Sequence, residues 1–139
     1  VKNVIGLVHA GWLGTMLNIG QVAIKAVTER YGSNAADLKV GIGPSICGQC
    51  YEVGEDVLTR FDKYWKKDYQ RFFRPHGNKF LLDIPAANEF TLRQAGVVNI
   101  EQSNICTAEN LHEWYSYRKE KGLTGRFAAL IALRGEKNE

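Results

Sequence analysis

The residue with the clearest chemical potential is His9, in the run His9-Ala-Gly-Trp-Leu-Gly-Thr15. Residues 4–8 are a continuous apolar run, which predicts a buried strand ending just before this histidine. Apolar residues recur at helical spacing over 16–31, so a helix should begin within a few residues. Ligands bind at the carboxyl ends of strands, and the N–H groups of a helix start favour anions. His9 is therefore a candidate metal ligand, general base or phosphate contact, and the alternative is a local cap of the strand.

The second candidate is the pair Cys47 and Cys50, in the glycine-rich loop 43–54. This Cys-x-x-Cys spacing is typical of redox pairs and of half a zinc site. The distant candidates for two further zinc ligands are Cys106, His76 and His112. Their spacings match no common zinc module, and glycine and proline in the loop speak against a helical redox motif. We therefore interpret these cysteines as structural, and the Gly-Pro-Ser turn at 43–45 as a pocket wall.

The third candidate is the polar-aromatic stretch near the end of the chain, with Tyr115, Arg118 and Arg126. An aromatic ring can stack on a planar base, and a guanidinium fork can hold a phosphate. The alternative is a solvated basic face with aromatic anchors. His76 and His112 both read as surface residues, and Asp83 as the cap of the helix that follows it.

The elements that position these residues alternate between strands and helices. Besides 4–8, we expect strands at 38–42, 80–84, 97–102 and 127–133. Besides 16–31, we expect helices at 55–64 and 85–94, the second opened by a proline. Residues 65–77 read as an aperiodic connection, 103–124 as mostly loop and 135–139 as a frayed tail. The order predicts one α/β or α+β domain.

Bulk properties narrow the class of protein. A chain of 139 residues, 45% hydrophobic and 24% charged, is one folded domain. A net charge of +3 does not indicate nucleic-acid binding, and three cysteines make no disulfide framework. We expect no membrane span and a cytoplasmic location. The chain opens on Val1 inside a hydrophobic stretch, which predicts a domain truncated at its N-terminus.

Together these stretches resemble the YfiH-type family, once called laccase-domain or polyphenol oxidase proteins. That family shows a His-Ala-Gly-Trp-Arg-Gly turn, a Gly-Pro-x-Ile loop ending in Tyr-Glu-Val-Gly, and a Leu-Asp-Ile/Leu segment leading into a helix with Asn. It closes with Cys-Thr, an aromatic-Ser-Tyr-Arg run and Gly-Arg. The corresponding stretches here are 9–14, 43–54, 82–88, 106–107, 115–118 and 125–126.

The resemblance implies an α/β sandwich with a mixed β-sheet flanked by helices and a zinc or copper ion in a cleft. It implies a transferase, a purine nucleoside phosphorylase acting on adenosine, inosine, guanosine or methylthioadenosine, with adenosine deaminase (hydrolase) activity in some members. Purine nucleoside and phosphate would be the partners. His9 would be the metal ligand and catalytic residue, Arg118 and Arg126 would orient phosphate or ribose, and Tyr115 would flank the base.

Two departures from the family leave alternatives open. Leu13 stands where the family has Arg, and the family's other metal ligands, in Gln-x-His and Ala-Asp-Cys stretches, would lie before Val1. A catalytic zinc generally needs three protein ligands, so a single domain 1–139 should bind this metal poorly. Copper-dependent polyphenol oxidation is one alternative, although three histidines are few for it. A non-catalytic fragment is the other. The preferred nucleoside, the choice of zinc or copper, and the oligomeric state stay open.

Overall fold

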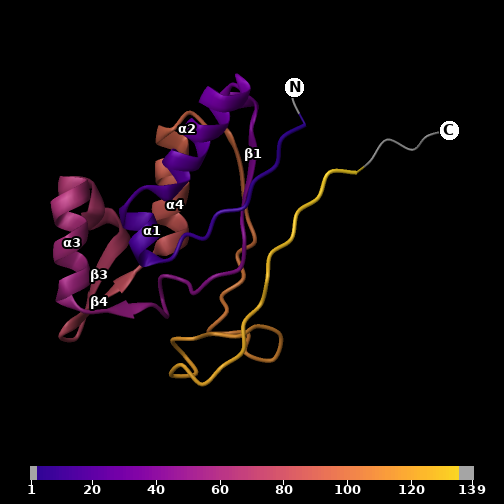
Figure 1. The fold of residues 1–139 in the computed structure, drawn as a ribbon. Coiled ribbons are helices and arrows are strands. Elements are labelled where there is room, and N and C mark those ends of the chain that lie inside the picture. Colours follow the sequence, from indigo (N-terminus) through magenta and orange to yellow (C-terminus); the bar gives the residue numbers. More distant parts are fainter. Residues whose placement is uncertain (1–2, 135–139) are drawn as a thin grey trace.

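The computed structural model describes residues 3–134 and arranges them as helices packed beside two small sheets (Figure 1). The helices are α1 (Trp12–Met16), α2 (Ile19–Tyr31), α3 (Glu55–Trp65) and α4 (Ile84–Gln94), with 3-10 segments η1 (Ala35–Asp37) and η2 (Lys66–Phe72). The strands are β1 (Lys39–Ile42), β2 (Glu52–Val53), β3 (Phe73–His76), β4 (Lys79–Leu82) and β5 (Asn99–Gln102). No helix in this part of the chain is long and apolar enough to cross a membrane.

The strands fall into one parallel and one antiparallel sheet. β1 and β5 pair in parallel, with Ile42 opposite Gln102, so both strands end at the same edge. The second sheet is antiparallel in the order β2-β4-β3. The expected mixed α/β class is confirmed, with the two strand orientations separated into different sheets.

The larger core lies where α3, η2 and the antiparallel sheet meet α1 and α4. Phe61, Leu82 and Ala87 are fully enclosed there. Aromatic rings fill the space edge to face, as between Phe61 and Trp65 with centroids 5.3 Å apart. The Trp65 Nε1–H donates to the carbonyl of Met16 at 2.8 Å, which ties α1 to the end of α3. A smaller core of Ile24, Leu92 and Val97 joins α2 and α4 to the parallel sheet.

Most of the predicted elements are present within a residue or two. The helices expected at 55–64 and 85–94 are α3 and α4, and the strand expected at 38–42 is β1. The strands expected at 80–84 and 97–102 are β4 and β5, each shorter than predicted. The connection 65–77 holds η2 and β3, which its sequence did not signal, and β2 lies inside the predicted loop 43–54.

The helix expected over 16–31 is α2, which begins three residues later at Ile19, and a separate short helix, α1, precedes it. α1 ends at Met16, and Asn18 takes the left-handed conformation at φ 57° before α2 begins. Asparagine tolerates this conformation better than most residues, which allows the chain to bend between the two helices. The helical spacing of apolar residues continues across the bend, so the sequence pattern did not reveal it. Gly32 ends α2 at φ 62°, a left-handed conformation that glycine adopts without steric cost.

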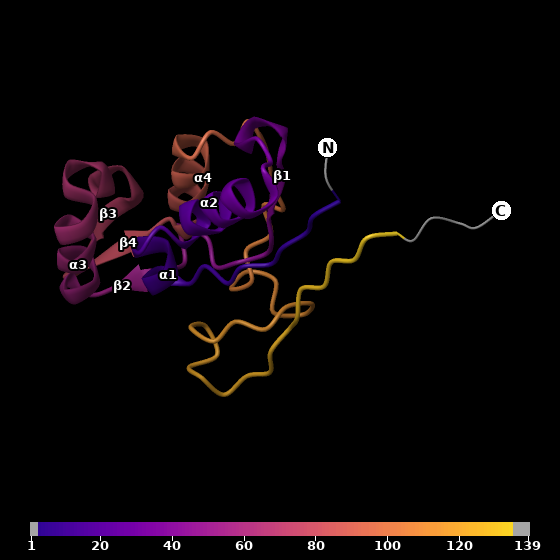
Figure 2. The same ribbon diagram turned by 45° about the horizontal axis from the view of Figure 1, so that its top comes forward.

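The strands expected at 4–8 and 127–133 do not form, and this prediction is wrong for the described chain. Both segments are extended without ladder partners, and Leu7 and Leu130 are 56% and 93% exposed. Figures 1 and 2 show them passing on the same side of β1, away from α3. A continuous apolar run predicts a strand only where neighbours cover both of its faces, and residues 3–134 supply none there. The predicted frayed tail, 135–139, lies outside the described residues.

Candidate functional site

His9 lies in an exposed turn directly before α1. Its ring folds back over Gly11, where a Cβ atom would come within 3.1 Å of the His9 Nε2 atom. The glycine therefore makes room for the imidazole, because a side chain at this position would crowd the ring. The expected position at a strand exit is wrong, because residues 4–8 form no strand. Leu13, at the position of the family arginine, is 47% exposed.

The turn is held by a chain of hydrogen bonds that begins in α4. Asn88 is buried, and its Nδ2 donates to the Thr15 hydroxyl at 2.9 Å and to the carbonyl of Ile84 at 3.0 Å. The fully enclosed Thr15 hydroxyl donates in turn to the carbonyl of Ala10 at 3.3 Å. Ala10 is the neighbour of His9, so the helix fixes the backbone that carries the imidazole. Buried polar groups that satisfy one another in this way specify a local conformation.

A pocket of about 460 Å³ opens at the edge where β1 and β5 end. Its walls come from the loop after β1, the loop after β5, and the start of α4. Gly43 and Ser45 line it, which confirms the predicted role of the Gly-Pro-Ser turn. This is where ligands bind in open α/β sheets, at the carboxyl ends of parallel strands.

The side chains lining this pocket favour a cation over a phosphate. Two carboxylates, Asp83 and Glu109, and two thiols, Cys47 and Cys106, face it, and among the described residues no lysine, arginine or histidine does. Asp83 caps α4 by accepting from the backbone N–H of Ala86 at 3.0 Å, as predicted. That cap occupies the helix end that an anion would otherwise use.

The residues able to hold a metal are Cys47, Cys50, Cys106 and Glu109, whose ligand atoms all lie within 4.8 Å of one another. The structure brings Cys106 to the Cys-x-x-Cys pair but neither His76 nor His112, which are exposed as expected. Glu109 was missed by sequence reasoning. The signal for it is the repeated interval, Cys-x-x-Cys in one loop and Cys-x-x-Glu in the other.

His9 belongs to no such group within residues 3–134. Of the ligands that the family resemblance implies, residues 3–134 contain only the predicted one, His9, so they do not fit that metal by themselves, since a catalytic zinc needs about three protein ligands.

The predicted substrate residues lie on the long loop after β5, away from the pocket lining. Arg118 stacks on the Tyr51 ring at 5.0 Å and donates to the carbonyl of Glu52 at 2.5 Å. Burial raises the pKa of Tyr51, and the positive charge of Arg118 acts against this rise. The contact fixes the loop against β2 and uses one of the five guanidinium donors.

The other two predicted residues are tied to the end of the same loop. Tyr115 is 51% exposed, and its ring lies against Gly125, where a Cβ atom would come within 2.6 Å of it. Arg126 stacks on the ring of Tyr117 at 5.1 Å and donates to the carbonyl of Gly125 at 2.8 Å. Tyr115 and Arg126 are therefore neighbours through Gly125, while Arg118 faces the antiparallel sheet.

Comparison with known proteins places the chain among bacterial relatives. The family described as "Multi-copper polyphenol oxidoreductase laccase" matches residues 1–134. The purine nucleoside phosphorylase YlmD of Bacillus subtilis (strain 168) is 33% identical over 136 residues, which are 96% of this chain and 49% of the relative. A purine nucleoside phosphorylase of Deinococcus radiodurans is 39% identical over 132 residues, which are 94% of this chain and 49% of the relative.

Solved structures share the fold. YlmD from Geobacillus stearothermophilus superimposes with a TM-score of 0.76 at 31% identity, covering 84% of this chain and 44% of that one. The hypothetical protein YfiH of Bacillus licheniformis gives 0.75 at 32% identity, covering 82% and 44%. The chain spans about half the length of the curated relatives it matches. With nearly its whole length matched, the chain belongs to the multi-copper polyphenol oxidoreductase laccase family, and the YfiH-type resemblance of its motifs is confirmed.

Proposed function

We propose that this chain is part of a metal-dependent purine nucleoside phosphorylase. The observation that carries the proposal is the match over more than nine-tenths of the chain to two relatives of that name. The hydrogen-bond chain from Asn88 to the His9 turn supports it, because a site residue needs a backbone held by the fold. His9 is the proposed metal ligand and catalytic residue, and the ion would be zinc or copper with its remaining ligands from outside residues 3–134.

The proposed reaction is attack of phosphate on the ribose carbon that bears the purine. The protein must bring an anion and a nucleoside together and stabilise the departing base, so positioning supplies much of the acceleration. In the proposal Arg118 and Arg126 orient the phosphate or ribose and Tyr115 stacks on the base. Arg118 donates to the Glu52 carbonyl through one nitrogen, and Arg126 donates to the Gly125 carbonyl through one nitrogen, so each guanidinium group has further N–H groups with which to bind a phosphate. Tyr115 is about half exposed, which leaves its ring accessible to a base.

The test is release of hypoxanthine from inosine by the complete gene product, with and without phosphate. Phosphate-dependent release that His9→Ala abolishes and His112→Asn leaves unchanged would support the proposal. A folded, metal-loaded protein that releases no base would remove it. Adenosine separates the further activities, because phosphorolysis yields adenine whereas deamination yields inosine.

Copper-dependent phenol oxidation is the second candidate, favoured by the description of the family. Dioxygen uptake with a phenol in copper-loaded but not zinc-loaded protein would support it. The third candidate is a non-catalytic fragment, favoured by coverage of about half of each relative. Intact mass and metal content of the protein isolated from its source distinguish it: a mass near 15.6 kDa without metal would support the fragment.

A further inference from the structure

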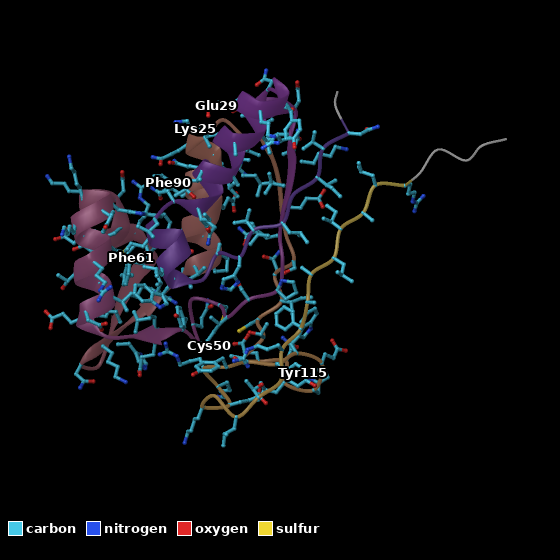
Figure 3. All side chains as sticks on the ribbon, in the orientation of Figure 1. Lys25, Glu29, Cys50, Phe61, Phe90 and Tyr115 are labelled. Atoms are coloured by element: carbon cyan, nitrogen blue, oxygen red, sulfur yellow. The ribbon has the colours of Figure 1, made fainter. Side chains whose placement is uncertain are left out.

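Two short turns from distant parts of the sequence meet beside the pocket. Cys47 and Cys50 lie on the loop after β1, and Cys106 and Glu109 lie on the loop after β5. The loops are joined by a parallel bridge, in which the Ser45 N–H donates to the carbonyl of Ile105 at 3.2 Å. In Figure 3, Cys50 lies where these two loops approach each other.

Each turn has the hydrogen bonding of a cysteine metal knuckle. The Cys50 N–H donates to the Cys47 carbonyl at 3.0 Å, and the Glu109 N–H donates to the Cys106 carbonyl at 3.2 Å. The first sulfur of each turn also accepts backbone N–H groups, from Gln49 at Cys47 and from Cys47 itself at Cys106, the latter at 3.3 Å. Amide donors aimed at sulfur stabilise thiolates, which are the form that binds metal.

The four side chains converge on one point. The Cys50 sulfur lies 3.5 Å from a Glu109 carboxylate oxygen, and all four ligand atoms fall within 4.8 Å. Ligand atoms around a tetrahedral zinc with bonds of 2.3 Å are about 3.8 Å apart. The cluster therefore needs only a small contraction to enclose an ion.

The donor set decides which ion fits. Three thiols and one carboxylate offer soft ligands that magnesium and calcium do not prefer, whereas zinc takes them in a closed tetrahedral site.

We propose that Cys47, Cys50, Cys106 and Glu109 bind one zinc ion, which clamps the loop after β1 to the loop after β5. None of these ligands is His9, so the site is separate from the proposed catalytic metal. With four protein ligands it has no open position and its role is structural.

The contacts around the turns show what the clamp would hold. Gly48, between the two cysteines, packs so closely on Asp83 that a Cβ atom there would come within 2.8 Å of the Asp83 Cβ. Arg74 donates to the Gly48 carbonyl at 3.0 Å and brings positive charge beside a site with a net negative charge. Asn110 donates to the Cys106 carbonyl at 2.8 Å. A zinc ion here fixes three walls of the pocket together.

The experiment measures zinc and cobalt binding to the complete gene product, purified without oxidant. We expect one zinc that survives dialysis in His9→Ala protein, and a cobalt form with thiolate-to-metal absorption. In Cys50→Ala protein that absorption should fall by about one third, as three thiolates become two. In Glu109→Gln protein three thiolates remain and zinc binding should weaken by at least about tenfold. Glu113→Gln, an exposed carboxylate on the same loop, is the matched control and should bind as the unaltered protein does.

Several results would overturn the proposal. These are a folded protein with no retained zinc in the His9→Ala background, unchanged zinc affinity in both ligand variants, or a Cys47–Cys50 disulfide in place of metal. Folding of each variant is checked by circular dichroism, and Glu109→Gln, an exposed position, keeps the test available if Cys50→Ala does not fold. Since the readout is metal and not turnover, it is independent of phosphorylase activity.

Discussion

Substitution of Thr15 by valine should release the His9 turn while leaving the shape of the core nearly unchanged. The hydroxyl is fully enclosed, and it accepts from Asn88 at 2.9 Å and donates to Ala10 at 3.3 Å. Valine removes both bonds, and one of the two amide N–H groups of Asn88 keeps its bond to Ile84. The other is left buried without a partner, for which we expect a loss of about 1–3 kcal/mol of unfolding free energy.

The assay is urea unfolding followed by circular dichroism, in a double-mutant cycle with Asn88→Ala. Because Thr15→Val orphans an N–H group of Asn88 that the double variant no longer contains, the double variant should be more stable than the sum of the two losses predicts, by about 0.5–3 kcal/mol. Thr28→Val is the matched control. Its hydroxyl bonds only to the Lys25 carbonyl on the exposed part of α2, so its loss should stay within about 0.5 kcal/mol.

The NMR signal of the His9 ring gives a second readout, which should shift in Thr15→Val protein while that of His112 does not. If the loss of unfolding free energy in the double variant equals the sum of the two single losses to within about 0.3–0.5 kcal/mol, the two side chains act independently and the reasoning fails. An unmoved His9 signal would refute the positioning role specifically.

Three further outcomes follow from other contacts. Gly48→Ala should destabilise the fold by about 1–3 kcal/mol in urea unfolding, because the new methyl group meets the Asp83 Cβ at the capped end of α4. The hydrogen bond from Arg93 lowers the pKa of Glu89, so this carboxylate stabilises the fold above its unfolded pKa and the effect is lost as pH falls through its folded pKa. Glu89→Gln should therefore be slightly less stable at pH 7, by less than about 1 kcal/mol for so exposed a pair, and equal near pH 3. Phe61→Ala, in the enclosed aromatic core, should cost about 3–5 kcal/mol by the same measurement.

Sequence periodicity predicted the elements that carry their own signals. α3 and α4 have a helical repeat of apolar residues, and α4 also has a capping aspartate followed by proline. β1 and β5 are short strands with partly buried aliphatic residues at alternate positions, Val40 and Ile42 in β1 and Ile100 in β5, and their pairing in parallel follows from the helices between them. These elements position the pocket, so its place at the strand ends was predictable.

The errors arose where the outcome depends on contacts distant in the sequence. Residues 4–8 and 127–133 have the composition of buried strands, but a strand requires a neighbour, and composition does not report one. Glu109 repeats the spacing of the Cys-x-x-Cys pair, but it becomes a candidate ligand because the Ser45–Cys106 bridge brings its turn to the cysteines. The sequence offered Cys106, His76 and His112 as distant ligand candidates, and of these the structure brings Cys106 alone to the cysteine pair, together with Glu109.

Helix α4 connects the two candidate metal sites. Its cap, Asp83, packs on Gly48 within the cysteine turn, and Asn88 holds Thr15 below the His9 turn. Asp83 and Asn88 are five positions apart, which is about 7.5 Å along a helix axis. Asn88 lies within the first two turns of α4, so a displacement of the capped end of the helix is carried to Asn88 by the same short stretch of backbone hydrogen bonds. Ordering of the cysteine turn by zinc would therefore restrain the helix that also fixes the proposed catalytic histidine, although the two sites share no ligand.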